Sequence, residues 1–401
     1  QQRMAQARLG HLRERRAGVM KPLLLGERSR AQLGLSLIEI LVGVAIGIVG
    51  VLAIFQTLAV WNRHMLTTTA GGDAQVSGAL ALFDLERDLK QSGHGFGNAP
   101  APVMGCAVQA FDSTGRGAFN FNLAPINIVV GAGGAPDQIN VLYGNSSFFV
   151  EAQSFLFSTP TSKTLVRRGG FKMGDLVVVA DAGGVGPGTA NCSLAEITAD
   201  TNLDLATVDH ANANYASFYT GGAVAPRFNP PGGLAFAYAA GNLYNLGPTP
   251  QMISWQISNN RVLRRSEAIF NPPPLDVADG VINLKAQFGV DANISTMIEP
   301  GEWVAALPLG TNWTQVLAIR VAILVRSRQF EKSNDAGSGA PIAVTTAAPT
   351  YFGGPFVMTN VDGNPDAFGG APNTPDPNNW RFYRYRVYER VIPLRNMLWP
   401  L

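Results

Sequence analysis

The chain has 401 residues, of which 46% are hydrophobic and 14% are charged, and its formal net charge is +2. This composition can supply a core and excludes a disordered chain. Residues 1–34 hold eight of the lysines and arginines against Glu14 and Glu27, so the remainder is mildly acidic. An acidic body lacks the basic surface that phosphate backbones require, so we expect no nucleic-acid partner.

The first predicted element is an apolar helix over residues 35–60. No charged residue occurs from Ile40 to Phe55. At ~1.5 Å rise per residue, the helix would reach ~39 Å and span a bilayer core. The run is too long for a secretory signal peptide. Basic residues precede it, whereas Arg63 is the only lysine or arginine from its end until Arg87. The amino terminus is therefore predicted to be cytoplasmic and the rest of the chain to lie outside.

Glu39 is unusual, because an unpaired acid in hydrocarbon costs ~2.5–3.5 kcal/mol near a helix centre and normally has a partner. Cleavage after Gly34 would create a positive α-amino group at Leu35, four residues from Glu39 and on the same helical face. The same amino group could reach the acid of a neighbouring subunit in a bundle. The alternative is an incidental acid near a helix end.

A basic leader ending in Gly34, followed by an apolar segment with Glu39 as its fifth residue, resembles the signal of type IV pilins and type II secretion pseudopilins. The resemblance implies that a prepilin peptidase cuts between Gly34 and Leu35 and methylates the new amino terminus of Leu35. Leu35 departs from the phenylalanine usual in the family at this position. A leader starting at Met20 already has the family's length, so we interpret residues 1–19 as an overextended start or as an added segment that is not native.

The segment 79–97, ALALFDLERDLKQSGHGFG, resembles the end of the long amino-terminal helix in minor pilins of the PilW kind. Helical spacing predicts an apolar face that covers a sheet as ordinary core. Three glycines from Gly93 to Gly97 are predicted to end the helix, and Gly71 and Gly72 to mark a bend. The apolar face comprises Val76, Leu80, Leu82, Phe83, Leu85 and Leu89.

Residues 98–401 are predicted to form strands. A hairpin is expected around Asn259 and Asn260, whose side chains tolerate the positive φ of a tight turn. VLAIRVAILVRSR alternates between an apolar face and one that carries Arg320 and Arg326. RFYRYRVYERVI is predicted to place Tyr383, Tyr385, Val387 and Val391 opposite Arg384, Arg386 and Arg390. This strand and the RNMLW that follows also resemble the PilW carboxyl terminus.

Residues 331–380 are rich in glycine and proline and are predicted to form a long loop or to be disordered. Within them, Asp362, Asn364 and Asp366 have the alternating spacing of a calcium loop, but the loop glycine and bidentate glutamate are missing. An Asx-rich turn is the simpler interpretation. We therefore expect no metal site.

Two cysteines, Cys106 and Cys192, are separated by 85 residues and match no zinc or redox spacing. In an oxidising compartment we expect a disulfide, worth ~4 kcal/mol in the chain-entropy model, in preference to free buried thiols. No catalytic motif is present, and the glycine-rich stretches 131–134 and 183–188 open no helix. We therefore expect turns there, no enzyme activity and no cofactor.

Together these features predict an α+β, pilin-like fold in which a long amino-terminal helix packs on an antiparallel β-sheet domain. The expected divisions are a removed leader (1–34), a transmembrane and assembly helix (35–60), its amphipathic continuation (61–97) and a β-rich globular domain (98–401). The resemblance implies a minor pilin that primes type IV pilus assembly and sits at or near the pilus tip. The alternatives are a J-type pseudopilin of type II secretion and an uncleaved bitopic envelope protein.

The expected partners are other minor pilins, the major pilin, the prepilin peptidase and the inner membrane, with a tip adhesin as a further candidate. The expected location is the inner membrane, as a single pass with the bulk of the chain periplasmic, and later the pilus or cell surface. Glu39 is expected to dock the subunit against the amino terminus of an adjacent subunit.

Processing is directly testable. Co-expression with a prepilin peptidase should give a mature chain that begins at Leu35, as read by amino-terminal mass spectrometry. Gly34→Val should block the cut, because the family's peptidase requires a small residue there, whereas Gly26→Val in the same leader should not. An intact leader on the wild-type chain, or a cut beyond the apolar segment, would contradict the cleavage prediction.

Overall fold

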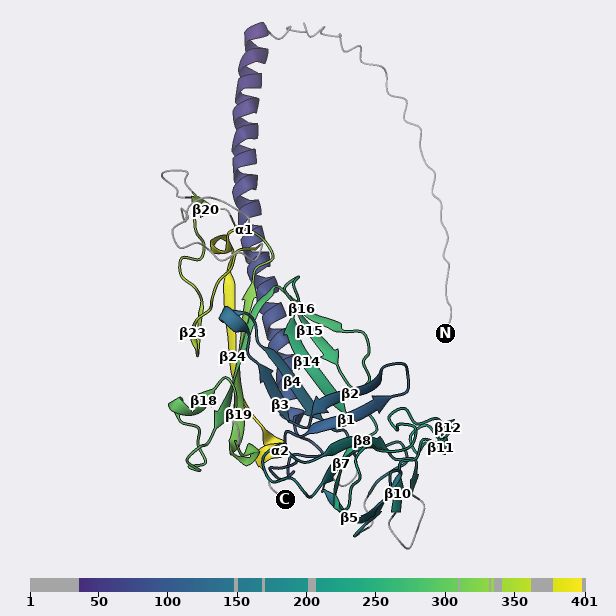
Figure 1. Cartoon of the computed structure of the whole chain (residues 1–401). Helices are drawn as coiled ribbons and strands as arrows, with labels where there is room; N and C mark the ends of the chain where they lie inside the picture. The colour runs from purple at the N-terminus through teal and green to yellow at the C-terminus, as the bar shows by residue number, and fades with distance from the viewer. Residues whose placement is uncertain are drawn as a thin grey trace, which may run out of the picture. The chain divides into compact units, whose positions relative to one another are not determined.

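The computed structural model describes residues 36–147, 151–167, 170–200, 207–308, 311–331, 333–334, 341–361 and 378–398. The chain separates into two compact units, Gln1–Asn62 and Arg63–Leu401. Within its described residues, the first unit consists of the amino-terminal part of helix α1 (Leu37–Gln91). The second unit holds the rest of α1 and all of the described strands (Figure 1).

Within the second unit, α1 buries one side and exposes the other. Ala81, Leu85 and Leu89 are fully buried in the main core. Val76 and Phe83, by contrast, are 70% and 66% exposed, and Leu80 is exposed as well. The prediction that all of these apolar residues form one core face was therefore wrong for these three. The helix continues through Gly71 and Gly72 and ends at Gln91, before Gly93, which has a φ of 78°.

The largest sheet has nine strands in the order β2-β1-β8-β7-β13-β5-β6-β10-β9. All of its neighbours are antiparallel except β1 and β8, which are parallel. Its strands are β1 (Ala107–Asp112), β2 (Gly117–Asn122), β5 (Gln153–Ser158), β6 (Ser162–Leu165), β7 (Leu176–Asp181), β8 (Cys192–Glu196), β9 (Ala199–Asp200), β10 (Thr207–Asp209) and β13 (Gly241–Gly247).

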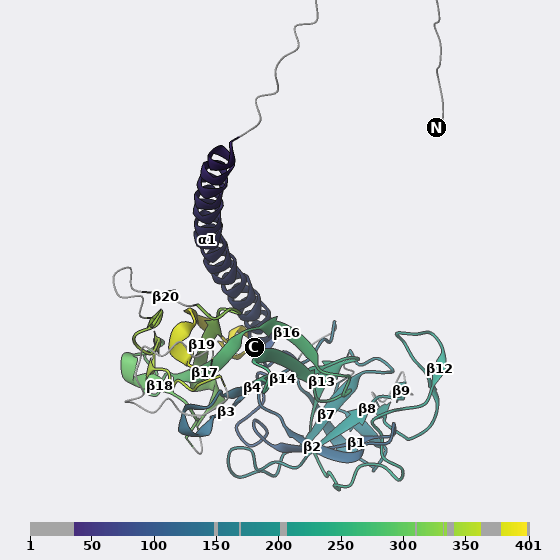
Figure 2. The ribbon, with the colours of Figure 1, turned by 90° about the horizontal axis from the view of Figure 1, so that it is seen from above.

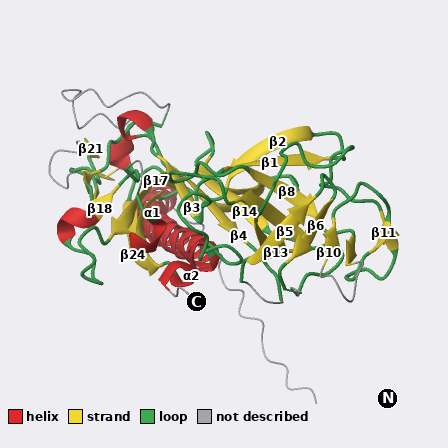
Figure 3. Cartoon of the chain, turned by 60° about the horizontal axis from the view of Figure 1, so that its bottom comes forward, coloured by secondary structure: helices red, strands yellow, loops and turns green. Residues whose placement is uncertain are grey.

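Two further antiparallel sheets complete the main framework, with the orders β16-β15-β14-β4-β3 and β18-β17-β19-β24. The five-stranded sheet lies between the other two (Figures 2 and 3). Its strands are β3 (Ile126–Val129), β4 (Gln138–Tyr143), β14 (Gln251–Ile257), β15 (Val262–Glu267) and β16 (Leu275–Asp279). The four-stranded sheet consists of β17 (Val281–Val290), β18 (Trp303–Val304), β19 (Val316–Arg326) and β24 (Tyr385–Pro393).

Short elements occupy the connections. Two-stranded pairs are β11 (Tyr215–Ala216) with β12 (Ala223–Val224), β20 (Ser333–Asn334) with β21 (Pro341–Ile342), and β22 (Thr350–Tyr351) with β23 (Gly354–Pro355). The 3-10 helices are η1 (Ala132–Gly134), η2 (Pro300–Glu302), η3 (Trp313–Gln315) and η4 (Trp380–Phe382), and the last described element is the short helix α2 (Arg395–Leu398). η1 falls within the glycine-rich stretch 131–134, and the stretch 183–188 lies between β7 and β8.

The predicted fold class was wrong. An α+β, pilin-like fold places one long helix on one antiparallel sheet, whereas this body is mostly β and is divided among several sheets (Figure 3). The nine-stranded sheet also contains a parallel pair. The physical reason is length: residues 98–401 supply more apolar strands than one helix can cover, so sheets must cover one another. The main apolar cluster joins α1 to all three larger sheets, and two smaller clusters lie on single sheets under connecting segments.

Strand β19 shows how both sides of a sheet are covered. Ile319, Val321 and Ile323 face the main core and are fully buried, as the alternation predicted. Ala322 and Leu324 on the opposite side are buried too, under a second cluster that contains Phe356, Met358 and Trp380. Part of the segment 331–380 therefore forms a packed cover, although disorder was one of the predicted alternatives. Asp362, Asn364 and Asp366 lie outside the described residues.

Two local predictions need correction. The β14–β15 hairpin exists, with Ile257 paired to Leu263, but the residue with positive φ is Arg261 at 60° and not the preceding asparagines. In β24, Val391 is 57% exposed although it was predicted to share the apolar side with Tyr385 and Val387. Tyr385 and Val387 pack on the second cluster, which does not include Val391.

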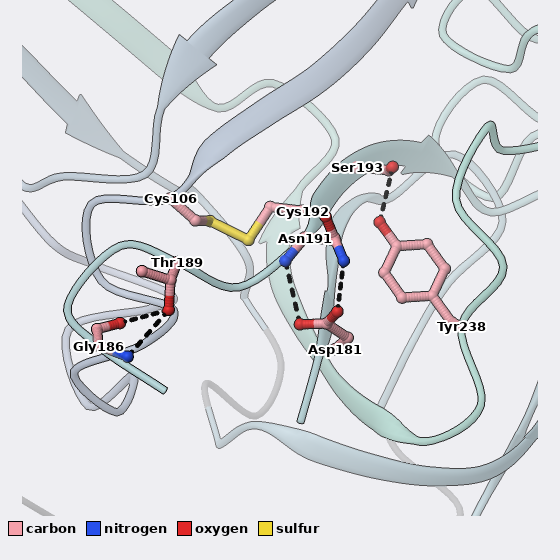
Figure 4. Close-up of a disulfide and its surroundings, with 8 residues drawn as sticks. All are labelled: Cys106, Asp181, Gly186, Thr189, Asn191, Cys192, Ser193 and Tyr238. Atoms are coloured by element: carbon pink, nitrogen blue, oxygen red, sulfur yellow. Dashed lines mark hydrogen bonds between the residues drawn. A yellow bond between two sulfur atoms is a disulfide. The ribbon is translucent and has the colours of Figure 1, made fainter. Parts of the chain in front are cut away.

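A disulfide joins Cys106, immediately before β1, to Cys192, the first residue of β8 (Figure 4). These strands form the parallel pair, in which Val108 lies opposite Cys192. Both cysteines are fully buried. Nearby, Asn191 donates two hydrogen bonds to the Asp181 carboxylate, from its backbone N (3.0 Å) and from Nδ2 (2.7 Å). The covalent link therefore fixes a connection between strands that are distant in sequence.

Reducing this bond should lower the free energy of unfolding of the full-length protein by ~2–5 kcal/mol, because the unfolded chain regains the entropy of a long loop. Denaturant unfolding with and without reductant measures the change, and the Cys106→Ser/Cys192→Ser variant is the control that should no longer respond to reductant. Envelope-isolated protein, unfolded without reductant, should resist maleimide. Labelling of both cysteines under those conditions would contradict the prediction.

Candidate assembly interface

The amino-terminal part of α1 has the length and composition of a membrane span. Leu37–Asn62 comprises 26 residues with a mean hydropathy of 2.8, and no part of the described chain buries it. The hydroxyl of Thr57 donates to the carbonyl oxygen of Ala53 at 2.9 Å, so this polar group is satisfied within the helix. On these properties the segment could cross a membrane once.

Glu39 lies in the first turn of α1 and is exposed. Its backbone N–H donates to the hydroxyl oxygen of Ser36 at 3.2 Å, so Ser36 caps the start of the helix. The pattern S-L-I-E is the signature of a capping box, a signal that the sequence interpretation of Glu39 did not use. Gly34 and Leu35, the predicted cleavage and methylation positions, lie outside the described residues.

Asp88 is the buried polar contact between α1 and the rest of the second unit. This side chain is 1% exposed, and its carboxylate accepts hydrogen bonds from Trp255 Nε1 (3.2 Å), Arg265 Nε (2.9 Å) and the hydroxyl of Tyr143 (3.2 Å). These partners come from β14, β15 and β4, three adjacent strands of the five-stranded sheet. Burial, with a smaller contribution from Asp88, raises the pKa of Tyr143 to about 12, so this hydroxyl keeps its proton and remains a donor.

Strand β24 provides a second line of contacts. The Tyr388 hydroxyl donates to the carbonyl oxygen of Gln75 at 3.1 Å, and Arg390 Nε donates to Glu86 at 3.1 Å. Glu86 also pairs with Lys90 at 2.6 Å, and hydrogen bonds from Lys90 and then Arg390 hold the pKa of its carboxyl below the ordinary value. The ring of Tyr388 lies where a side chain at Gly78 would be, so this glycine permits close contact between helix and strand.

The carboxyl terminus of α1 is capped by the residue Asn396 of α2. Its Nδ2 donates to the carbonyl oxygens of Gln91 (3.1 Å) and Ser92 (2.9 Å), which the end of a helix leaves without intrahelical partners. The N–H of Gly93 donates to Leu142 of β4 at 2.9 Å. The helix is therefore fixed along its side and at its end.

The most perturbed titratable pair in the described residues lies elsewhere, in the nine-stranded sheet region. Lys163 Nζ lies 2.9 Å from His210 Nε2, and both side chains are buried. Desolvation lowers the pKa of Lys163 to about 8 and that of His210 to about 3. A substrate has no access to a pair buried this deeply, so we interpret it as structural. Among the described residues, no group of three His, Cys, Asp or Glu could hold a metal ion.

Comparison with known families gives one result for this chain. Residues 258–396 match the family model of Type IV Pilus-assembly protein W. The match covers less than half of the chain and runs from the β14–β15 turn to α2. It supports involvement in type IV pilus assembly. Searches of curated proteins and of solved structures found no match.

The matched segment contains most of the residues that hold the body part of α1. Arg265, Tyr388, Arg390 and Asn396 all lie within it, and each contacts α1 or the residue that follows its end. The sequence interpretation noted Arg390 for its charge and missed the other three contacts. Asp88 is not part of the predicted apolar face, so helical spacing gave no signal of its burial.

Asp88→Asn should lower the free energy of unfolding by ~3–5 kcal/mol, because Arg265 would then be left without its ion-pair partner at a largely buried position. Denaturant unfolding of the full-length protein measures this effect. Glu86→Gln is the matched control on the same helix, and its loss should be at most ~1 kcal/mol because its partners are exposed. Equal losses for the two variants would contradict the assigned role of Asp88.

Proposed function

We propose that this chain is a minor pilin that primes type IV pilus assembly at the inner membrane and joins the fibre at or near its tip. In this proposal, Leu37–Asn62 anchors the subunit in the membrane before assembly, and the body provides side contacts to other minor pilins and the major pilin. The role is mechanical. The description of the matched family, an assembly protein, supports this role over an enzymatic one.

The observation that carries the proposal is the combination of one amino-terminal apolar helix with a body in which most of the side chains that bond to the helix lie in the matched segment. A fibre subunit stored in a membrane needs its apolar helix to remain attached to its body when it leaves the membrane. The buried Asp88 and the capped end of α1 supply that attachment in the second unit. These contacts support an assembly role.

Processing and docking complete the proposal. A prepilin peptidase would cut between Gly34 and Leu35. The methylated amino terminus of Leu35 would then lie four residues from Glu39. Glu39 would then form a charge-assisted contact with the amino terminus of an adjacent subunit, which offsets the cost of an acid in lipid. A J-type pseudopilin of type II secretion would use the same signal, but the matched family's description favours the pilus.

The charge of Glu39 can be tested separately from its place in the helix. Glu39→Gln removes the charge and keeps the shape, so membrane insertion, protein level and cleavage should be unchanged while pilus assembly is lost. Ser36→Ala is the matched control, because it removes the cap on the N–H of Glu39 and keeps the charge. That variant should still assemble, since losing a cap costs only ~1 kcal/mol.

The measurements are surface pili and co-purified minor pilins from a strain that carries each variant, with protein level checked by blot. Normal assembly of Glu39→Gln at normal protein level would reject Glu39 as the docking group. Loss of assembly in both variants would assign the effect to the start of the helix and not to the charge.

A further inference from the structure

Residues of β24 spaced two apart face α1, and they form a row of contacts with it. Ile392 is buried in the core, Arg390 pairs with Glu86, and Tyr388 bonds to Gln75. Arg386 is the next member of this row. It is exposed and makes no hydrogen bond or ion pair with the described residues, so the row ends with an uncompensated positive charge.

A large cavity lies beside Arg386. Its volume is ≈ 790 Å³, and α1 lines it with Gly71, Gly72, Ala74 and Gln75. The opposite side consists of Val344, Thr345 and residues 384–387 of the carboxyl-terminal strand region. All of these residues belong to the second unit. We call this cavity, defined by these residues, the Arg386 groove.

The two glycines have no function within the chain that the structure explains. A Cβ atom added to Gly71 or Gly72 would meet nothing within 4 Å. Each glycine costs ~1 kcal/mol relative to alanine inside a helix. Gly78 differs, because a Cβ there would collide with Tyr388. The space left at Gly71 and Gly72 therefore admits a group from outside the chain, close to the helix backbone.

The charges of the groove indicate what that group carries. Arg384, its other cation, is already paired, because its Nε lies 2.8 and 2.9 Å from the two carboxylate oxygens of Glu331. Arg386 retains its full set of donors, and a guanidinium binds a carboxylate through two parallel hydrogen bonds. The groove is thus complementary to an acidic side chain.

We propose that the Arg386 groove receives an acidic residue on a helix of a neighbouring, different pilus subunit. The missing side chains at Gly71 and Gly72 let the two helix backbones approach, and Arg386 binds the carboxylate. Three of the four acids on the body part of α1, Asp84, Glu86 and Asp88, are already engaged within the chain. A second copy could therefore offer only Asp73 from this part of its helix, and we choose a different subunit as the partner. This inference rests on the proposed function, because the partner exists only in a pilus assembly.

Charge reversal tests the arginine. Arg386→Glu should reduce co-purified pilus subunits at least about tenfold, because it places two acids in contact. Arg386→Lys should retain part of the binding. Arg395→Glu is the matched control, since Arg395 is also exposed, makes no hydrogen bond or ion pair with the described residues and lies just beyond the other end of β24. The amount of pilus subunits that co-purify with Arg395→Glu should be unchanged.

Filling the Arg386 groove at Gly71 tests whether the glycines serve subunit binding or only the stability of the chain. Gly71→Leu meets open space and adds helix propensity, so the thermal midpoint of the full-length protein should stay equal or rise. Subunit co-purification should nevertheless fall. Gly222→Leu is the matched control, because its added side chain also meets nothing within 4 Å, and it should leave co-purification unchanged.

The outcomes separate this inference from the proposed function. Normal co-purification of both Arg386→Glu and Gly71→Leu overturns the groove, and if Glu39→Gln still fails to assemble, the pilin function stands. A basic substitution of an acid in another pilus subunit that restores Arg386→Glu supports the groove and names the partner. A cross-link between one copy that carries Thr345→Cys and a second copy that carries Asp73→Cys overturns the choice of a different subunit.

A membrane lipid is the remaining alternative for an anion on Arg386. Full-length wild-type and Arg386→Glu proteins are kept soluble in detergent micelles. The binding of each protein to phosphatidylglycerol vesicles and to phosphatidylcholine vesicles is then compared. Equal binding of the two proteins is the expected result. A selective loss of phosphatidylglycerol binding in Arg386→Glu, with normal subunit co-purification, would replace the subunit by a lipid and overturn the proposal.

Discussion

The buried carboxylate of Asp88 determines how the body of this protein is organised. An ionised group that is 1% exposed is tolerated only where several donors meet it, and here they come from three adjacent strands. The requirement fixes both the rotation of α1 and the part of the sheet against which it packs. Leu85 and Leu89 then face the core, and Val76 and Phe83 face away from it.

Other buried acids join the layers in the same way. Asp137, which precedes β4, accepts from the backbone N–H of Ala286 (3.0 Å) and from Lys285 Nζ (2.9 Å), and thereby connects the five- and four-stranded sheets. Asp112 accepts two hydrogen bonds from the guanidinium of Arg227, which holds the pKa of its carboxyl well below the ordinary value. Some acids of the body are therefore used inside it, where they accept hydrogen bonds from segments that are distant in the chain.

The carboxyl-terminal third of the chain combines two roles. Its inner side holds α1 through Tyr388, Arg390 and Asn396, and its outer side is covered by Phe356, Met358 and Trp380. The family match falls on this part and not on the nine-stranded sheet. The matched region thus contributes four of the side chains that contact α1 and its end, while Trp255 and Tyr143 lie outside it. The nine-stranded sheet, which carries the disulfide, lies on the far side of the five-stranded sheet (Figure 2).

The sequence by itself determined the features that depend on neighbouring residues. An uninterrupted apolar run defines a possible membrane span, alternation defines the inner side of β19, and paired asparagines mark the β14–β15 turn. Only the tertiary structure decided that one helix faces several sheets, that Asp88 is buried and that Val391 is exposed. The physical reason is that each of these features depends on donors or covering side chains from segments that are distant in the chain. Trp255 donates to Asp88, and Met358 covers β19, although both are far away in the sequence. The local spacing of apolar residues carries no information about such contacts.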